Sequence, residues 1–400
     1  MTQVSWLRAA ALLSCLLVST ACSTLEGPAV AAGQLPPLVH GGIPVTLAEV
    51  ATRSPTPDLL ALTPEMQAFV ARYAPPRGGA RQRLLSLHEA VKGQGALGVA
   101  YDPSADGTAA TVFRTGAANC LSFAHLFVAL AREAGLDARY QWLEVRPQWT
   151  RLGERIAVRL HVNVMVRMPS GEQFMVDIDP LQSRDIAASR LLEDADAAAL
   201  DHNNIAVEAL SRGDLEAAWI ELARALQLSP GLSHLWVNLG AVYRHAGQFS
   251  EAEWSLLQAL AIDRADRSAM NNLVVLYGQM GRADERDHWV DRINRYRDRN
   301  PWYHAWLGDR AGEAGDWAAA LAHYRVALKL HPDDSALLYA TGIIHFRLQQ
   351  YAAAERLIEQ AIAAASLRSD IQGYRAQLEV VRQRQLAEVQ PASGSGSTRI

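Results

Sequence analysis

The chain has few of the features that mark several classes of protein. Its 400 residues include only three cysteines, and its acidic residues slightly outnumber Lys and Arg, which gives a net charge of −4. Without a basic excess to neutralise phosphates, nucleic acid is excluded as the main partner. No apolar run of about 18 residues follows the first two dozen, which excludes a polytopic membrane protein. Half of the residues are hydrophobic, an ordinary globular composition with room for two or three folding units.

The N-terminal residues are typical of an export signal. Arg8 is followed by an apolar run, residues 9–18, that is too short to span a bilayer. The stretch Val-Ser-Thr-Ala-Cys that ends at Cys22 is similar to a bacterial lipobox. We therefore expect a signal peptide over residues 1–21 and lipidation of Cys22, with ordinary cleavage as the alternative. The lipid would anchor the protein in the cell envelope, at the outer membrane facing the periplasm.

Residues 22–57 contain repeated Pro, Gly and Ala and show no sustained periodicity. Such a composition is typical of a linker. We therefore expect these residues to form a tether between the lipid and the folded body.

Cys120 is the one thiol expected in the folded body, because Cys15 lies in the signal and Cys22 in the anchor. It follows a loop and opens a strongly helix-forming stretch, residues 121–134, that Gly135 closes. Free N–H groups at a helix start favour a thiolate, so we expect this position to lower the pKa of Cys120. The position is typical of a nucleophile, although a small buried core residue is the other interpretation.

Two alternating stretches downstream predict a β-hairpin. In residues 156–166 the even positions are all aliphatic, and His161 is among the odd ones. Residues 174–179 also alternate, with Asp177 and Asp179 on the polar face. Pairing in which residue numbers sum to 338 places Asp177 opposite His161, and a sum of 340 places Asp179 there. Diagonal neighbours are about 7–8 Å apart, so either carboxylate can orient the imidazole.

A cysteine on a helix, a histidine on a strand and a carboxylate on the next strand follow one another in the transglutaminase-like branch of papain-type enzymes. Residues 60–185 resemble this family in the pair Asn119-Cys120 and in the helix and "G-hydrophobic-x-A-R" strand over 127–140. The strands that carry His161 and the Val-Asp pair at 176–177 match its next two strands.

The resemblance implies an α+β papain/transglutaminase-like domain, which we place at residues 58–190. It implies Cys120 as nucleophile, His161 as general base and acid, and Asp177 as the group that fixes the imidazole tautomer. Asp179 is the alternative third residue. No cofactor or metal is expected. The acceptor of the acyl group, water or an amine, stays open, and so does whether the domain is active.

From residue 199 onward the chain repeats with a period of 34 residues. Blocks begin at 199, 233, 267, 301 and 335, and small residues recur at block positions eight, twenty and twenty-seven. This resembles the tetratricopeptide pattern, in which small residues let two antiparallel helices approach and stack. We expect five repeats over 199–368, a capping helix over 369–390 and a disordered tail over 391–400. Arg286 replaces alanine at position twenty of the third block, which predicts looser packing there.

The first helices of such repeats line a concave surface that can bind an extended peptide or a partner helix. Aromatic residues at these positions can equally pack between helices. Together these features predict an exported lipoprotein with a cysteine acyl-transfer domain, a peptidase, amidase or transferase, and a peptide- or protein-binding solenoid. A non-catalytic envelope scaffold is the alternative. The expected concave residues are Asn203, Val237, Arg244, Asn271, Trp302, Tyr339 and Phe346.

Overall fold

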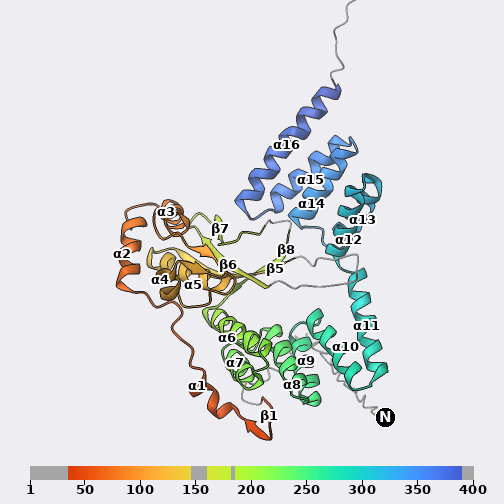
Figure 1. Ribbon diagram of the computed structural model, residues 1–400. Helices are drawn as coiled ribbons and strands as arrows, with labels where there is room; N and C mark the ends of the chain where they lie inside the picture. The colour runs from red at the N-terminus through yellow and green to blue at the C-terminus, as the bar shows by residue number, and fades with distance from the viewer. Residues whose placement is uncertain (1–34, 146–159, 182–184, 390–400) are drawn as a thin grey trace, which may run out of the picture.

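The computed structural model describes residues 35–145, 160–181 and 185–389. It has two parts: a body of helices and strands, and a long arc of helices that follows it in the chain (Figure 1). The predicted order of an α+β unit and an all-α solenoid is confirmed. Within the described ranges, no helix is both long and apolar enough to cross a bilayer.

A four-stranded antiparallel sheet of order β7-β6-β5-β8 forms the centre of the first part. The even-numbered valines of β6 are buried in one hydrophobic core with helix α5, which explains their strict alternation. The elements are α2 (Pro64–Tyr73), α3 (Ala80–Lys92), β3 (Ala100–Tyr101), α4 (Ala109–Thr115), β4 (Ala117–Ala118), α5 (Cys120–Glu133), β5 (Asp137–Val145), β6 (Leu160–Arg167), β7 (Gln173–Val176) and β8 (Ile186–Leu192).

Strands β6 and β7 form the predicted hairpin. Val164 pairs with Val176 and Met165 with Met175, so the paired residue numbers sum to 340. Strand β7 ends at Val176, three residues before the predicted end of the alternating stretch. Residues 156–159, where the first strand was expected to begin, lie outside the described residues. The chain therefore leaves the sheet just before the two candidate carboxylates.

Five antiparallel helix pairs and a final helix form the arc. The alanines at repeat positions twenty and twenty-seven are fully buried wherever they occur, as the tetratricopeptide pattern requires. The helices are α6 (Asp194–Ser211), α7 (Leu215–Leu228), α8 (Ser233–His245), α9 (Phe249–Ile262), α10 (Arg267–Gln279), α11 (Ala283–Asp298), α12 (Pro301–Glu313), α13 (Trp317–Leu330), α14 (Ser335–Arg347), α15 (Tyr351–Ala364) and α16 (Arg368–Val389).

The third repeat is the most loosely packed of the five, because its second helix buries so little. Helix α11 buries a single residue, Trp289. This tryptophan belongs to the core shared by the first three repeats and the body, whereas Trp302 of α12 belongs to a separate core. The division of the core agrees with the looser packing predicted for this block.

The segment expected to be a tether is described from residue 35 to residue 57, and part of it packs against the solenoid although most of its residues are exposed. It contains β1 (Leu38–His40), β2 (Ile43–Val45), a short 3₁₀ turn (Leu47–Glu49) and α1 (Val50–Arg53). Leu38 and Val50 are fully buried, and the Tyr243 hydroxyl of α8 donates to the Pro36 carbonyl at 2.5 Å. Burial of these apolar side chains outweighs the linker-like composition of the segment. Residues 1–34, with the predicted signal and Cys22, and the predicted tail 391–400 lie outside the described residues.

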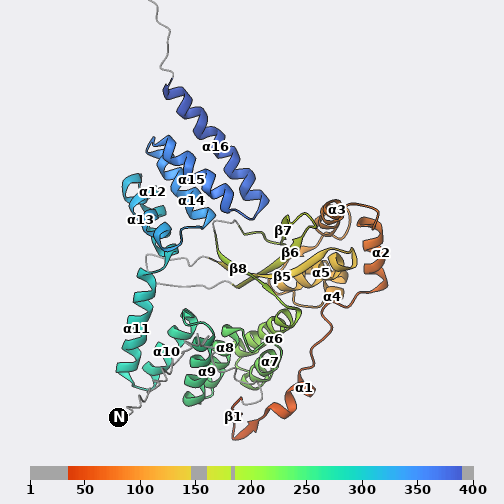
Figure 2. The same ribbon diagram turned by 180° about the vertical axis from the view of Figure 1, so that it is seen from behind.

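The arc curves around one end of the sheet, as Figures 1 and 2 show from opposite sides. The ring of Trp142 on β5 lies 4.8 Å from the ring of His234 on α8, and Arg190 of β8 lies over the same indole. At the other end of the arc, Arg368 of α16 forms an ion pair with Glu172 at 2.6 Å. The body and the solenoid are thus in contact at both ends of the arc.

Candidate functional site

Cys120 is the first residue of α5. The Asn119 side chain accepts a hydrogen bond from the Ser122 N–H at 2.9 Å, and the Ser122 hydroxyl accepts one from the Asn119 N–H at 3.0 Å. This capping box satisfies two N–H groups that a helix start leaves unpaired. The sequence did contain a signal for this box, since the polar residues Asn119 and Ser122 are three positions apart on either side of Cys120, but the box was not predicted. The box holds the thiol at a defined helix end.

His161 and Asp177 are in direct contact. The imidazole Nε2 lies 2.5 Å from the Asp177 Oδ2, and both residues are buried. The Asp179 N–H donates to the other oxygen, Oδ1, at 3.1 Å. Asp177 therefore reaches the histidine from beyond the end of β7, as a diagonal neighbour rather than a directly opposed one. Asp179, the alternative, contributes a backbone N–H that supports this carboxylate.

Cys120 is partly exposed, and its thiol lies beside strand β6, which carries His161 and Val162. Burial, the largest influence, raises the pKa of Cys120, the Val162 N–H lowers it and the negative charge of Asp177 raises it again. The N–H groups of Leu121 and Cys120 also lower this pKa, but the net direction is upward. The expectation that the helix start would lower the pKa is therefore wrong in its net sign, because the desolvation of the thiolate outweighs the N–H donors.

His161 and Asp177 are thus in direct contact, and Cys120 lies beside the strand that carries His161. Val162, whose N–H faces the thiol, directly follows His161, and Asp177 acts electrostatically on the thiol while it contacts the imidazole. Lys92, which the sequence analysis missed, donates to the carbonyls of Asp177 and Ile178 at 3.2 and 3.0 Å. This lysine anchors the chain where it leaves β7.

The face of the sheet that carries His161 also holds unpaired polar atoms. Asn163 lies two residues further along β6 and pairs across the sheet with Gln141 of β5. Within the described residues, neither the Asn163 amide nitrogen and oxygen nor the Gln141 side-chain oxygen has a hydrogen-bond partner, and all three are buried. A buried polar group without a partner costs about 1–3 kcal/mol. These atoms are therefore available to a bound water or to another polar group.

The residues expected on the concave surface are largely engaged within the chain. Val237 and Trp302 are buried, and the rings of Tyr339 and Tyr374 stack at 4.2 Å between centroids. Asn203 accepts from the Asn238 amide at 2.7 Å. Most of the aromatic positions thus contribute to helix packing, the alternative that the sequence left open. The ring centroids of Phe346 and Tyr351 are 5.6 Å apart, and the Arg244 guanidinium contacts the His245 ring nitrogen Nε2. Asn271 is exposed.

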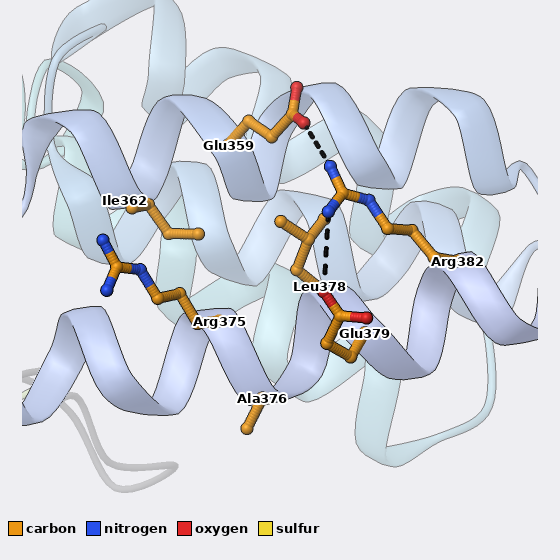
Figure 3. A pocket seen from close by; sticks show the side chains of 7 residues that line it. All are labelled: Glu359, Ile362, Arg375, Ala376, Leu378, Glu379 and Arg382. Carbon is orange, nitrogen blue, oxygen red and sulfur yellow. Dashed lines mark hydrogen bonds and ion pairs between the residues drawn. The ribbon is translucent and has the colours of Figure 1, made fainter.

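A groove lies between α15 and α16, far along the chain from Cys120 (Figure 3). Its volume is about 510 Å³, and Arg382 spans it with ion pairs to Glu359 and Glu379. None of Cys120, His161 and Asp177 lines this groove. Among the residues that the structure describes, no group of three His, Cys, Asp or Glu side chains could hold a metal ion.

Comparison with protein families agrees with both parts of the fold. Residues 68–180 match the model of the transglutaminase-like superfamily, and tetratricopeptide repeat models match residues 233–266 and 313–378. The protein therefore has a transglutaminase-like core domain followed by tetratricopeptide repeats. Cys120, His161 and Asp177 all fall within the first of these matches.

One curated relative is the cellulose synthase operon protein C of Pseudomonas fluorescens (strain SBW25). The two are 27% identical over an alignment of 146 residues, which covers 34% of this chain and 11% of that protein. The chain therefore spans only a small part of this relative's length.

The solved structures that match this chain, tetratricopeptide proteins among them, are only weakly similar to it. The MamA crystal structure has 16% identity and a TM-score of 0.23, and covers 42% of this chain and 91% of that chain. The Pseudomonas aeruginosa pilF structure has 18% identity and a TM-score of 0.24, and covers 50% and 96%. YrrB, described as a TPR protein with an unusual peptide-binding site, has 16% identity and a TM-score of 0.23, and covers 44% and 92%. Similarities of this size say nothing about function.

Proposed function

We propose that Cys120, His161 and Asp177 carry out acyl transfer through a thioester on the cysteine. The observation that carries the proposal is the 2.5 Å contact between His161 Nε2 and Asp177 Oδ2. It leaves Nδ1 as the imidazole nitrogen free to exchange a proton with the thiol of Cys120. A buried carboxylate against the far nitrogen stabilises the imidazolium that forms when that proton moves.

Each proton in the proposed reaction passes through His161. Nδ1 takes the thiol proton while the Cys120 sulfur attacks an amide carbonyl, and the backbone N–H of Cys120 is the default donor to the oxyanion. The intermediate collapses to a thioester, and the departing amine takes the proton from the imidazolium. Water or a second amine then attacks the thioester, gives a proton to His161 and releases the sulfur, which recovers that proton.

In this proposal, the raised pKa of Cys120 means that the resting protein favours a protonated thiol at this residue. Because burial and the Asp177 charge favour the neutral thiol, His161 is proposed to take the thiol proton during the attack. The reactivity of the thiol then depends on the imidazole being unprotonated.

The test is covalent trapping of Cys120 in the full chain. A library of peptides with C-terminal electrophiles should give an adduct on Cys120, identified by mass spectrometry. We expect Cys120→Ser to abolish the adduct and His161→Ala to slow its formation by roughly 10²-fold or more. His40→Ala, at an exposed histidine far from the site, is the matched control and should leave the rate unchanged.

A second measurement separates the acceptors. Products formed with and without an added primary amine distinguish hydrolysis from transfer. If no peptide forms an adduct with Cys120, or if His161→Ala leaves the rate of adduct formation unchanged, the catalytic proposal fails. The alternative of a scaffold that works through its repeats is then favoured.

The repeats themselves indicate binding of a protein or peptide, and we propose an extended peptide or a partner helix as the ligand. Peptides of the cell wall and proteins of the envelope are the proposed substrates, from the compartment that the N-terminal sequence suggests.

The envelope location rests on the lipobox-like residues before Cys22. A lipid on this cysteine would hold the protein at the outer membrane, facing the periplasm. Fractionation of cells that express Cys22→Ala should then recover the protein in the soluble periplasmic fraction. Tight membrane association of this variant would contradict the anchor.

A further inference from the structure

The carboxylate of the proposed triad lies on backbone that the sheet does not hold. Strand β7 ends at Val176, and its pairing with β6 ends there, where Val176 faces Val164. Asp177 nevertheless contacts His161 at 2.5 Å, and its other oxygen accepts a hydrogen bond from the Asp179 N–H in the same loop. Since ladder hydrogen bonds fix the backbone only within a strand, a contact from elsewhere has to hold this part of the chain.

Lys92 supplies that contact. Its ammonium group donates to the Asp177 carbonyl at 3.2 Å and to the Ile178 carbonyl at 3.0 Å. Asp177 and Ile178 are buried, and Lys92 is half-buried. A buried backbone carbonyl needs a donor, and a charged donor gives a stronger hydrogen bond than a neutral one. One ammonium group thus holds two consecutive carbonyls directly beyond the strand.

Lys92 is the last residue of α3, yet its side chain is not needed to close that helix. The carbonyls of residues 89–91 accept hydrogen bonds from backbone N–H groups of residues 93–99, at distances of 2.6 to 3.0 Å. A lysine near a helix end often bonds such carbonyls itself. Because backbone donors already serve them here, the ammonium group is left for the chain beyond β7.

Helix α3 is a firm base for this contact, because it packs against the helix that begins with Cys120. The buried leucines and valine of α3 belong to the core that also contains α5. The ring centroids of His88 on α3 and Phe127 on α5 are 6.4 Å apart. Lys92 therefore connects the backbone of Asp177 to the core that positions the thiol.

We propose that Lys92 is a positioning residue for Asp177: it holds the backbone at residues 177 and 178 and so keeps the carboxylate against His161. The inference rests on the proposed role of Asp177 in acyl transfer. Lys92 acts through the carboxylate and needs no contact with the substrate.

Loss of the ammonium group has two consequences for the site. Two buried carbonyls lose their donor, so the backbone beyond β7 shifts and Asp177 no longer lies steadily against His161. A displacement of about 1 Å at a catalytic group can cost about 10²-fold in rate. The negative charge of Asp177, which raises the pKa of Cys120, then also acts less on the thiol. Loss of a positive charge alone would raise this pKa, so the two explanations predict opposite shifts.

The test combines adduct formation with electrophilic peptides and the pH profile of iodoacetamide labelling of Cys120, both in the full chain. Lys92→Met should slow adduct formation by about 10- to 100-fold. It should also move the half-labelling point of Cys120 to lower pH and speed labelling at about pH 8. Lys92→Arg keeps the charge and can donate to both carbonyls, so it should restore most of the rate.

Lys329→Met is the matched control. Lys92 and Lys329 are the two lysines of the chain, and Lys329 is exposed on α13. This variant should change neither the rate of adduct formation nor the labelling profile. Should Lys92→Met fold poorly, Lys92→Gln, which has a shorter and uncharged side chain, should give the same two changes at smaller size.

A double-mutant cycle with Asp177→Asn separates positioning from a general loss of stability. If Lys92 acts through the carboxylate, Lys92→Met should slow adduct formation by less than about two-fold further in the Asp177→Asn background. An equal loss in both backgrounds would overturn the proposal, as would a labelling profile that stays in place or moves to higher pH. If the profile moves to lower pH but no variant forms an adduct, Lys92 still positions Asp177 and the proposed acyl transfer is what fails.

Discussion

At the scale of single residues, Asp177 has two opposing effects on the proposed chemistry. Its negative charge raises the pKa of Cys120 and so disfavours the thiolate in the resting protein. Through its contact with His161 Nε2 it also stabilises the imidazolium that forms during the attack. The same carboxylate therefore makes the free thiol less reactive and the acylation step faster.

The substitution Asp177→Asn separates these effects. The amide keeps the size of the side chain and can still accept from the imidazole, but the charge is lost. Since a raised pKa leaves less thiolate at a given pH, removal of the charge should lower the pKa and speed iodoacetamide labelling at about pH 8 several-fold. Acyl-enzyme formation should fall roughly 10²- to 10⁴-fold, because the imidazolium loses its counter-charge.

Asp179→Asn is the matched control for this change. Asp179 supports the site through its backbone N–H, which the substitution retains, so both rates should stay close to those of the unmodified chain. Slower labelling in Asp177→Asn would mean that the thiolate already exists as an ion pair with His161. A large loss of acylation in Asp179→Asn alone would make Asp179 the third residue.

At the scale of elements, the turn inside each helix pair shows how strictly the repeat constrains the backbone. Position fifteen of the first four blocks is glycine with positive φ, between 70° and 81°. In the fifth block the residue is Gln349, with φ of 60°. A side chain in this left-handed conformation costs about 1–2 kcal/mol, whereas glycine adopts it readily. The fifth turn is therefore the strained one.

A reciprocal pair of substitutions tests this difference. Gly315→Ala should lower the free energy of unfolding by about 1 kcal/mol, and the added methyl group meets no atom within 4 Å, so the cost is that of the backbone. Gln349→Gly should raise it, by less than about 1 kcal/mol because glycine loses more entropy on folding. Urea unfolding followed by circular dichroism measures both. Equal signs for the two changes would contradict the argument.

At the scale of the whole molecule, the arc and the body share an interface that the repeat pattern does not reveal. His234 lies on α8, one of the first helices of the repeats that were expected to line a peptide-binding surface, and its ring lies against Trp142 of the sheet. Burial, aided by the charge of Arg190, lowers the pKa of His234 to about 3, so this ring stays neutral in the interface. Part of the surface expected to bind another protein thus covers the chain's own domain.

The N-terminal segment shows the same limit of sequence reasoning. Its Pro and Gly content is typical of a linker, yet the Gln248 side chain of the solenoid accepts from the Val39 N–H at 2.8 Å. Four residues of irregular spacing, Leu35, Leu38, Val45 and Val50, are buried there. No periodicity in the sequence predicts such a contact, because the surface that these side chains pack against is formed by helices far along the chain.

The sequence by itself determined what depends on local spacing. The 34-residue period specified the helix pairs, alternation specified the hairpin, and the position of Cys120 before a helix-forming stretch specified the helix start. Only the tertiary structure decided which carboxylate reaches His161, since β7 ends at Val176 and the backbone beyond it leaves the register. It also decided the sign of the thiol's pKa shift and the contact of His161 with a residue beyond the end of β7. These outcomes depend on burial and on residues distant in the chain, and neither is encoded in the spacing of neighbours.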